Sequence, residues 1–303
     1  MNLENNQLEE LNIKLDYDTS KISWLKSGGK SKYFCNIKNI NQLTDLFKVI
    51  NDHKIPYLVV GNFSNILIQS SGFNGLILKL SGEFSNIGVS NNIITAGCSV
   101  LDLKFSMFCY ENSITGYEYL FTIPGTIGGN IFMNAGCYGF EISNQIKKIK
   151  IFDILTLKTS HVFPSEINFK YRNGYQEKNK LILSADFYTE LGDPILIKSK
   201  MNDFDNKRKK SQPQKVNCCG SIFKNPSSSS AWQLIESSVD DSFYIGEVRL
   251  SKKHSNFFEN DPYVDADKLI TFLKKVEDCV FKKHSIKLEK ELAFFLRNQD
   301  VHV

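Results

Sequence analysis

Apolar positions in the first third of the chain predict one helix followed by several short strands. Leu43, Leu46, Phe47 and Ile50 recur at helical spacing, so a helix is expected over 41–51. Short apolar runs bounded by glycine, asparagine or serine then predict buried strands at 57–60, 66–68, 76–80 and 93–96.

The middle of the chain continues this mixture. Ser99 is a candidate N-cap for a helix that carries Leu101, Phe105 and Phe108 on one face. Further apolar runs predict strands at 146–154 and 181–187. A polar and basic stretch over 198–214 separates this half from the rest, and a domain boundary is expected near it.

The last hundred residues carry their own core pattern. Asp265 is a candidate cap for a helix whose apolar residues are Leu269, Leu273, Val276 and Val280. A strand is expected next, around 286–288.

Composition narrows the class of protein. The 303 residues are 42% hydrophobic and 23% charged, which is typical of a globular chain with two or three packed substructures. A net charge of +4 is too small to indicate a nucleic-acid surface, although the basic cluster at 207–210 could attract an anionic ligand. The seven cysteines show neither disulfide nor metal-knuckle spacing, so reduced thiols and no metal site are expected.

The N-terminal sequence MNLENNQLEELN is polar and acidic, unlike a secretory signal, and no apolar stretch is long enough to span a membrane. A cytoplasmic protein without a membrane or an obligate protein partner is therefore expected.

Glycine gathers in the run TIPGTIGGNIFMNAGCYG at 122–139. Its five glycines can adopt positive φ and let main-chain amides approach a ligand closely. The run is a poor helix and a poor strand by composition, so a ligand cradle is expected.

A second glycine-containing loop, GNFSN at 61–65, directly follows an apolar strand. Amides and a serine hydroxyl in that position can hold a pyrophosphate, although a plain asparagine-rich turn would look the same. The two segments together favour a dinucleotide cofactor. The order strand, glycine-rich turn and long helix is missing, which argues against a nicotinamide-binding Rossmann fold.

Five segments, read in order, resemble the motif series of the UDP-N-acetylenolpyruvoylglucosamine reductase family. They are VVGNFSNIL at 59–67, GYEYLFTIPGTIGGNIFMNAGCYGFEI at 116–142, FKYR at 169–172, CGSIFKNP at 219–226 and LEKEL at 288–292. The resemblance extends from about Gly28 to Leu292. The absence of a long insert between Tyr175 and Met201 resembles the shorter subgroup, which lacks a tyrosine-bearing substrate loop.

The resemblance implies an α+β fold. An FAD-binding region of the vanillyl-alcohol-oxidase type, made of two α+β subdomains, would occupy 28–197 after an N-terminal extension over 1–27. A smaller α+β substrate-binding domain would occupy 198–303. The implied reaction is reduction of UDP-N-acetylglucosamine enolpyruvate to UDP-N-acetylmuramate, a step of peptidoglycan precursor synthesis, with NADPH as hydride donor. None of the five histidines lies in either glycine-containing segment, so non-covalent FAD is expected.

Three residues match the family's catalytic positions. Hydride addition to an enol ether conjugated to a carboxylate pushes negative charge into that carboxylate, and Arg172 offers a permanent positive charge there. Ser221, after Gly220, would donate the proton to the neighbouring carbon. Glu291, the second glutamate of LEKEL, would hydrogen-bond the developing enolate in its protonated form. Taken singly, each would more often be an ordinary surface or turn residue, and the ordered set of motifs reverses this balance.

The resemblance also implies binding residues. The cofactor-binding set is Gly61, Asn62, Ser64, Asn65, Pro124, Gly125, Thr126, Gly129, Gly136 and Tyr138. The substrate-binding set is Tyr171, Arg208, Lys224, Asn225, His254 and Asn256. A structural role for His254 is an equal alternative.

Three positions depart from the family pattern and leave two alternatives open. Phe63 stands where glycine is usual, Asn130 where alanine is usual, and Gly174 where serine is common. A flavin oxidase or dehydrogenase of the same fold would act on another substrate, but it would need no proton donor such as Ser221. A non-catalytic flavin or nucleotide-sugar binding protein is the other alternative.

Overall fold

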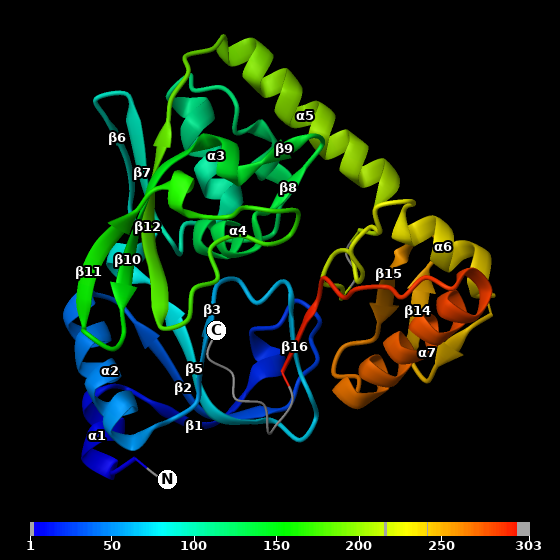
Figure 1. Ribbon diagram of the computed structural model, residues 1–303, viewed down its shortest axis with the longest axis horizontal. Coiled ribbons are helices and arrows are strands. Elements are labelled where there is room, and N and C mark those ends of the chain that lie inside the picture. The colour runs from blue at the N-terminus through cyan, green and yellow to red at the C-terminus, as the bar shows by residue number, and fades with distance from the viewer. Residues whose placement is uncertain (1–2, 215–216, 241, 296–303) are drawn as a thin grey trace.

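The computed structural model describes residues 3–214, 217–240 and 242–295. Their strands form three larger sheets, of four, five and three strands, and two separate strand pairs. We call the larger sheets with their helices the first, second and third modules. Figure 1 shows the first two modules stacked on one side of the molecule and the third module on the other, with α5 running between them.

The first module has the strand order β1-β2-β5-β3, in which β1 pairs antiparallel with β2 and the other neighbours are parallel. Its elements are α1 (Asn5–Glu10), β1 (Lys14–Asp18), β2 (Lys30–Ile37), α2 (Ile40–His53), β3 (Tyr57–Val60) and β5 (Phe73–Leu80). A short strand, β4 (Ile66–Ile68), lies outside this sheet.

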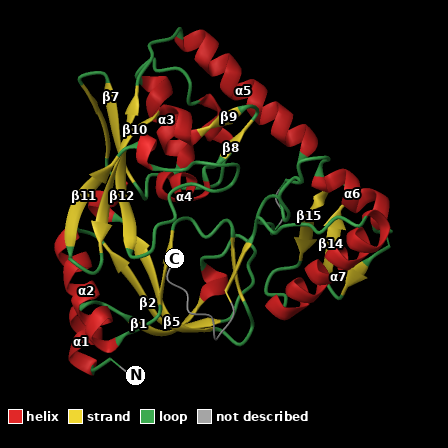
Figure 2. Cartoon of the chain, in the orientation of Figure 1, coloured by secondary structure: helices red, strands yellow, loops and turns green. Residues whose placement is uncertain are grey.

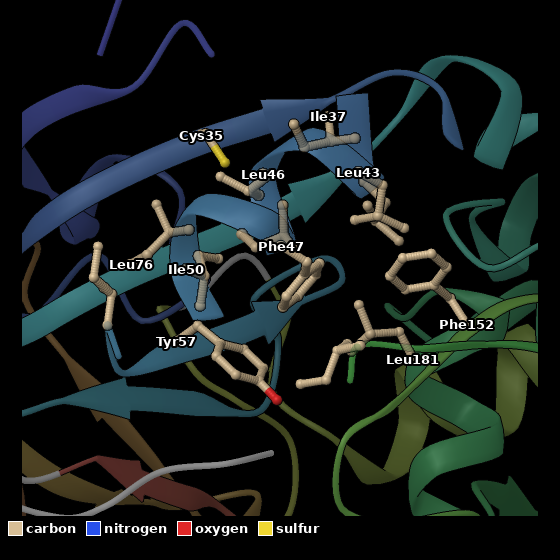
Figure 3. Close-up of a cluster of buried hydrophobic side chains, with 14 of the residues drawn as sticks. Cys35, Ile37, Leu43, Leu46, Phe47, Ile50, Tyr57, Leu76, Phe152 and Leu181 are labelled. Atoms are coloured by element: carbon tan, nitrogen blue, oxygen red, sulfur yellow. The ribbon is translucent and has the colours of Figure 1, made fainter. Parts of the chain in front are cut away.

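Helix α2 confirms the helix expected over 41–51. Asn39 caps it by accepting a hydrogen bond from the Gln42 amide, and it ends at Lys54 in the left-handed region with φ 49°. The four residues whose spacing predicted it are almost fully buried, so the helical spacing correctly identified the face that packs in the core. Figure 3 shows this face packed against the first sheet and against Phe152 and Leu181 of the second module, which join the two modules in one core.

The second module is an antiparallel sheet with the order β11-β10-β12-β7-β6. Its elements are β6 (Ile87–Ser90), β7 (Ile93–Gly97), α3 (Asp102–Glu111), α4 (Ile127–Met133), β10 (Ile146–Asp153), β11 (Lys158–Val162) and β12 (Lys180–Tyr188). After α4, β8 (Gly136–Cys137) and β9 (Phe140–Glu141) form one of the two separate strand pairs. The helices α3 and α4 lie on one side of this sheet in Figure 2. Short 3-10 helices occur at Thr19–Lys21, Gly82–Ser85, Glu118–Thr122, Ile142–Gln145 and Pro164–Glu166.

Two local predictions in this module were wrong. The Ser99 hydroxyl donates to the Leu80 carbonyl (2.7 Å) instead of capping a helix, and α3 begins at Asp102 with Leu101 43% exposed. The glycine-rich run contains a helix, α4, because Thr126 Oγ1 accepts from the Gly129 amide at its start. A favourable cap and burial of Ile127 and Ile131 outweigh the low helix propensity of its two glycines.

The polar stretch over 198–214 is largely helical. Helix α5 (Pro194–Ser211) has Pro194 in its first turn, and the Asp193 side chain caps it by accepting from the Ile195 amide (2.7 Å). Residue 198, the expected start of the substrate-binding domain, therefore lies inside a helix. The domain boundaries themselves stay a prediction.

The third module packs two helices beside a sheet of order β13-β14-β15. Its elements are α6 (Ala231–Ser238), β13 (Tyr244–Ile245), β14 (Val248–Ser251), β15 (His254–Asn260) and α7 (Ala266–His284). Asp265 caps α7 as expected, since its side chain accepts from the Asp267 amide. The strand expected at 286–288 was wrong, because Leu288 fills the core of this module without joining a sheet.

The end of the described chain returns to the first module. Strand β16 (Ala293–Phe295) pairs in parallel with β4, so that Ala293 lies opposite Ile66. This pairing places the LEKEL segment beside the first glycine loop. No helix among the described residues is long and apolar enough to cross a membrane.

Candidate active site

The two glycine-containing segments meet in space. Asn62 Nδ2 donates to the Pro124 carbonyl (3.3 Å), which joins the loop over 61–65 to the run over 122–139. A Cβ added at Gly61 would lie 2.4 Å from Thr126 Oγ1. Glycine is therefore required at position 61 for this close approach.

Several main-chain amides along this contact have no acceptor among the described residues. They belong to Asn62, Phe63 and Ser64 in the first segment and to Thr126 in the second. Consecutive free amides around a residue with positive φ form a concavity that suits an anion such as a pyrophosphate. Phe63, with φ 55°, is that residue.

The departure at Phe63 thus keeps the backbone conformation that a glycine would favour. The Phe63 side chain is 3% exposed and packs in a cluster with Phe34, Leu58 and Phe73. Burial of the ring offsets the strain of a left-handed backbone, which costs about 1–2 kcal/mol for a residue other than glycine.

The far end of the glycine-rich run turns at Gly136, where a Cβ would lie 2.0 Å from the Phe140 carbonyl oxygen. Tyr138, 38% exposed, stacks on Phe204 of α5 with 4.9 Å between ring centroids. The start of the run is held by the same helix, because Arg208 Nη1 donates to the carbonyl and hydroxyl oxygens of Thr122. Helix α5 therefore contacts both ends of the run.

Arg172 and Glu291 form an ion pair at the edge of this cradle. Arg172 Nε donates to Glu291 Oε1 (2.7 Å) across 119 residues of sequence, and Arg172 Nη2 donates to the Gly136 carbonyl (3.2 Å). Their side chains are only 19% and 16% exposed. Arg172 itself has φ 55°, and Tyr171 lies against its guanidinium at 4.9 Å.

Burial and pairing act in opposite directions on these two groups. Burial raises the pKa of Glu291, and the charges of Arg172 and Lys224 offset only part of that effect. Burial alone would lower the pKa of Arg172, but Glu291 outweighs it and raises that pKa. The site therefore holds a permanent cation beside a carboxyl group that binds a proton more readily than usual.

Ser221 follows Gly220, which has φ 82°, and its hydroxyl makes no hydrogen bond within the part of the chain that the structure describes. The next residue, Ile222, is held on both sides. Its amide donates to the Asn256 carbonyl (2.9 Å), and its own carbonyl accepts from the Glu291 amide (2.8 Å). This hydrogen bond between Glu291 and the residue after Ser221 holds the two segments side by side.

Asn256 is buried, with 3% of its surface exposed, and its side-chain amide hydrogen-bonds to the main chain of Phe223. Its Oδ1 accepts from the Phe223 amide (3.0 Å), and its Nδ2 donates to the Phe223 carbonyl (2.8 Å). This arrangement shapes the segment after Ser221. Substrate binding by Asn256 stays a prediction.

The remaining predicted substrate residues surround the same segment. Lys224 pairs with Glu289, and Asn225 Oδ1 accepts from the Ala231 amide (3.0 Å) at the start of α6. His254 Nδ1 accepts from the Asn256 amide (3.2 Å), and burial lowers the pKa of His254, which keeps the ring neutral near pH 7.

A buried polar pair beneath the cradle was not predicted. Asp102 is fully buried, its amide donates to the Gly125 carbonyl (3.2 Å), and its Oδ1 accepts from Asn130 Nδ2 (2.7 Å). Burial raises the pKa of Asp102 to about 8, although Asn130 and the Gly125 main chain act on the carboxyl group to lower it. The only signal for this pair in the sequence is Asn130 itself, which stands where alanine is usual in the family.

Comparison with known proteins decides the family. The chain is 36% identical over 283 residues to the UDP-N-acetylenolpyruvoylglucosamine reductase of Rickettsia massiliae, covering 92% of this chain and 94% of that protein. It is 37% identical over 290 residues to the reductase of the same name from Pelagibacter ubique, covering 92% and 93%. The chain belongs to the UDP-N-acetylenolpyruvoylglucosamine reductase family.

Family models and a solved structure also match parts of this chain. Residues 212–295 match the family model for the C-terminal domain of UDP-N-acetylenolpyruvoylglucosamine reductase, and residues 31–154 match a model for an FAD binding domain. The solved reductase from Thermus caldophilus superposes with a TM-score of 0.80 at 23% identity, covering 93% of this chain and 98% of that one. The resemblance and the α+β fold inferred from the sequence are confirmed. The protein is an FAD-containing oxidoreductase.

Proposed function

We propose that this reductase converts UDP-N-acetylglucosamine enolpyruvate to UDP-N-acetylmuramate with NADPH, and that Arg172, Ser221 and Glu291 carry the reaction. Family membership supports the reaction. The contact between Arg172 and Glu291 supports the roles, since it joins two distant motifs at the glycine cradle.

The cradle suits FAD. The free amides of residues 62–64 and of Thr126 would hold the pyrophosphate. The glycines at 61, 125 and 136 let this backbone pack closely on Thr126, Asp102 and Phe140. The bound flavin would supply the hydride that NADPH delivers to it. Tyr138 and Gly129 stay predicted cofactor residues, whereas the Asn65 side chain donates to the main-chain carbonyl of Glu291.

The protein's own residues account for the remaining chemistry. The Arg172 guanidinium would stabilise the negative charge that hydride addition places on the substrate carboxylate. The Ser221 hydroxyl, which has no partner among the described residues, would give a proton to the adjacent carbon. Glu291, with its raised pKa, would donate a hydrogen bond to the enolate.

The substrate's diphosphate would meet positive charge from Arg208 and Lys224 near the same cradle. A division at residues 28 and 198, a cytoplasmic location and the absence of an obligate protein partner belong to the same proposal.

An anaerobic spectroscopic titration tests the function. Purified protein should be yellow, should bleach with NADPH, and should regain its absorbance on addition of UDP-N-acetylglucosamine enolpyruvate. Bleaching without recovery would refute this substrate and favour a flavin oxidase. A colourless protein that binds no FAD would refute both enzymatic functions.

The role of Ser221 has its own test. Ser221→Ala should keep reduction by NADPH and slow product formation by roughly a hundredfold or more, the usual scale for removing a general acid. Ser227→Ala, at an exposed serine in the same segment, serves as the matched control. An equal loss in both half-reactions would show that Ser221 is structural.

A further inference from the structure

Asn65 is placed differently from the other asparagine of its loop. Asn62 donates to Pro124 within the cradle, whereas Asn65 Nδ2 donates to the main-chain carbonyl of Glu291 (2.9 Å), 226 residues away. The Asn65 carbonyl also accepts from the Ala293 amide (3.1 Å). Two hydrogen bonds from Asn65 therefore bracket the main chain that follows Glu291.

The opposite side of Glu291 is fixed by the segment that carries Ser221. The amides of Glu291 and Leu292 both donate to the Ile222 carbonyl, at 2.8 Å and 3.3 Å. The main chain at Glu291 is thus held through its N–H by the residue after Ser221, and through its C=O by Asn65. Only the Glu291 side chain is left to reach Arg172 (2.7 Å).

We propose that Asn65 is a positioning residue, whose side-chain amide fixes the main chain of Glu291 so that the carboxyl group meets Arg172 beside Ser221. This inference rests on the proposed role of Glu291 and deepens it. A displacement of about 1 Å in a reacting group can cost about a hundredfold in rate. A donor that sets the position of Glu291 therefore affects the chemical step although it touches no substrate.

The position of Asn65 also predicts a separation of effects between the half-reactions. Glu291 serves the reduction of the substrate, not the transfer of hydride from NADPH. Loss of the Asn65 donor should therefore slow only the second half-reaction. Loss of the Asn62 contact should instead loosen the cradle, because Asn62 joins its two segments.

The experiment compares Asn65→Ala, Asn65→Asp and Asn62→Ala in the full-length, FAD-loaded protein. FAD affinity is measured by flavin fluorescence, and each half-reaction by anaerobic stopped-flow absorbance. Both Asn65 variants should keep FAD affinity and reduction by NADPH within about threefold, and should slow reoxidation by the enolpyruvyl substrate by roughly 10- to 100-fold. Asn65→Asp matters because it keeps the shape of the side chain and cannot donate when ionised.

The pH profile separates positioning from a general structural role. With Glu291 displaced from Arg172, its carboxyl group loses a favourable charge and its pKa rises further. Because Glu291 is proposed to act when protonated, the alkaline limb of the reoxidation profile should move to higher pH. Asn62→Ala should weaken FAD binding and, at saturating FAD, leave that limb in place.

The outcomes distinguish this inference from the proposed function. If the wild-type flavin is not reoxidised by the enolpyruvyl substrate, the proposed function fails. If the wild type reacts and both Asn65 variants react equally fast with an unchanged pH profile, the positioning role alone is refuted. Weakened FAD binding with normal reoxidation in saturated Asn65 variants would refute it as well, and would make Asn65 a cofactor residue. If Asn65→Ala does not fold, Asn65→Asp gives the same decision.

Discussion

Ionisation of Asp102 should destabilise this protein as the pH rises. The carboxyl group is fully buried beneath the cradle, and its Oδ2 has no hydrogen-bond partner among the described residues. Burial is the main reason that its pKa rises to about 8, while Asn130 and the Gly125 main chain lower it by less. At neutral pH the folded protein therefore keeps this group mostly protonated.

The sign of the effect follows from proton binding. Between the ordinary pKa of 3.8 and about 8, the folded state holds a proton that the unfolded state has released. The free energy of unfolding therefore falls with rising pH, by about 1.4 kcal/mol for each pH unit. From pH 5 to pH 8 this amounts to at most about 4 kcal/mol.

Asp102→Asn removes the titration and keeps an oxygen that can accept from Asn130. At pH 5 it should be less stable than the wild type by about 1–3 kcal/mol, because an amide NH₂ without a partner replaces Oδ2. As the pH rises this difference should shrink and then reverse, so that the two stability curves cross.

Urea unfolding of the FAD-free protein, followed by intrinsic fluorescence at several pH values from 5 to 9, provides the measurement. FAD is left out because its binding would add a concentration-dependent contribution. Asn130→Ala is the control that removes the hydrogen-bond partner and keeps the titrating carboxyl group, and its stability should still fall as the pH rises. Parallel curves for wild type and Asp102→Asn would refute the reasoning.

Three further predictions concern the cradle. Phe63→Gly should lower the free energy of unfolding by about 2–4 kcal/mol in urea titrations, because the lost burial of the ring exceeds the relief of backbone strain. An increase in stability would contradict this. Gly174→Ser should destabilise the fold by about 1–3 kcal/mol in the same titrations, because a Cβ there would lie 1.9 Å from the Ile131 carbonyl oxygen. An unchanged midpoint of urea unfolding would show that the backbone shifts freely. Arg208→Ala should weaken FAD binding roughly tenfold in fluorescence titrations, because the glycine-rich run over 122–139 loses the charged donor that holds Thr122. Unchanged FAD affinity would show that Arg208 does not support the cradle.

The sequence was sufficient to predict an element where the spacing of apolar residues within one segment determines its structure. Leu43, Leu46, Phe47 and Ile50 predicted α2 because a helix places such residues on one face, whatever it packs against. Motif order likewise brought Arg172 and Glu291 into one hypothesis, and the structure shows them in contact.

The missed features depend on partners far away in the sequence. Neither Asp102 nor Asn130 is informative alone, since each matters only because the other lies within hydrogen-bond distance. Helix α5 has a polar sequence whose few buried residues, Ile197 and Met201, give a weak apolar period. Strand β16 was missed because its only ladder neighbour among the described residues is β4, near the start of the chain.

That same pairing has a consequence for the order in which the protein is completed during synthesis. The loop over 61–65 leaves the ribosome early, but the main-chain groups that Asn65 binds belong to Glu291 and Ala293. Domains fold as units from the N-terminus onward, so the contacts of this loop wait until residues 291–293 have been synthesised. A nascent or truncated chain that stops before residue 291 has a glycine cradle without the carboxyl group of Glu291.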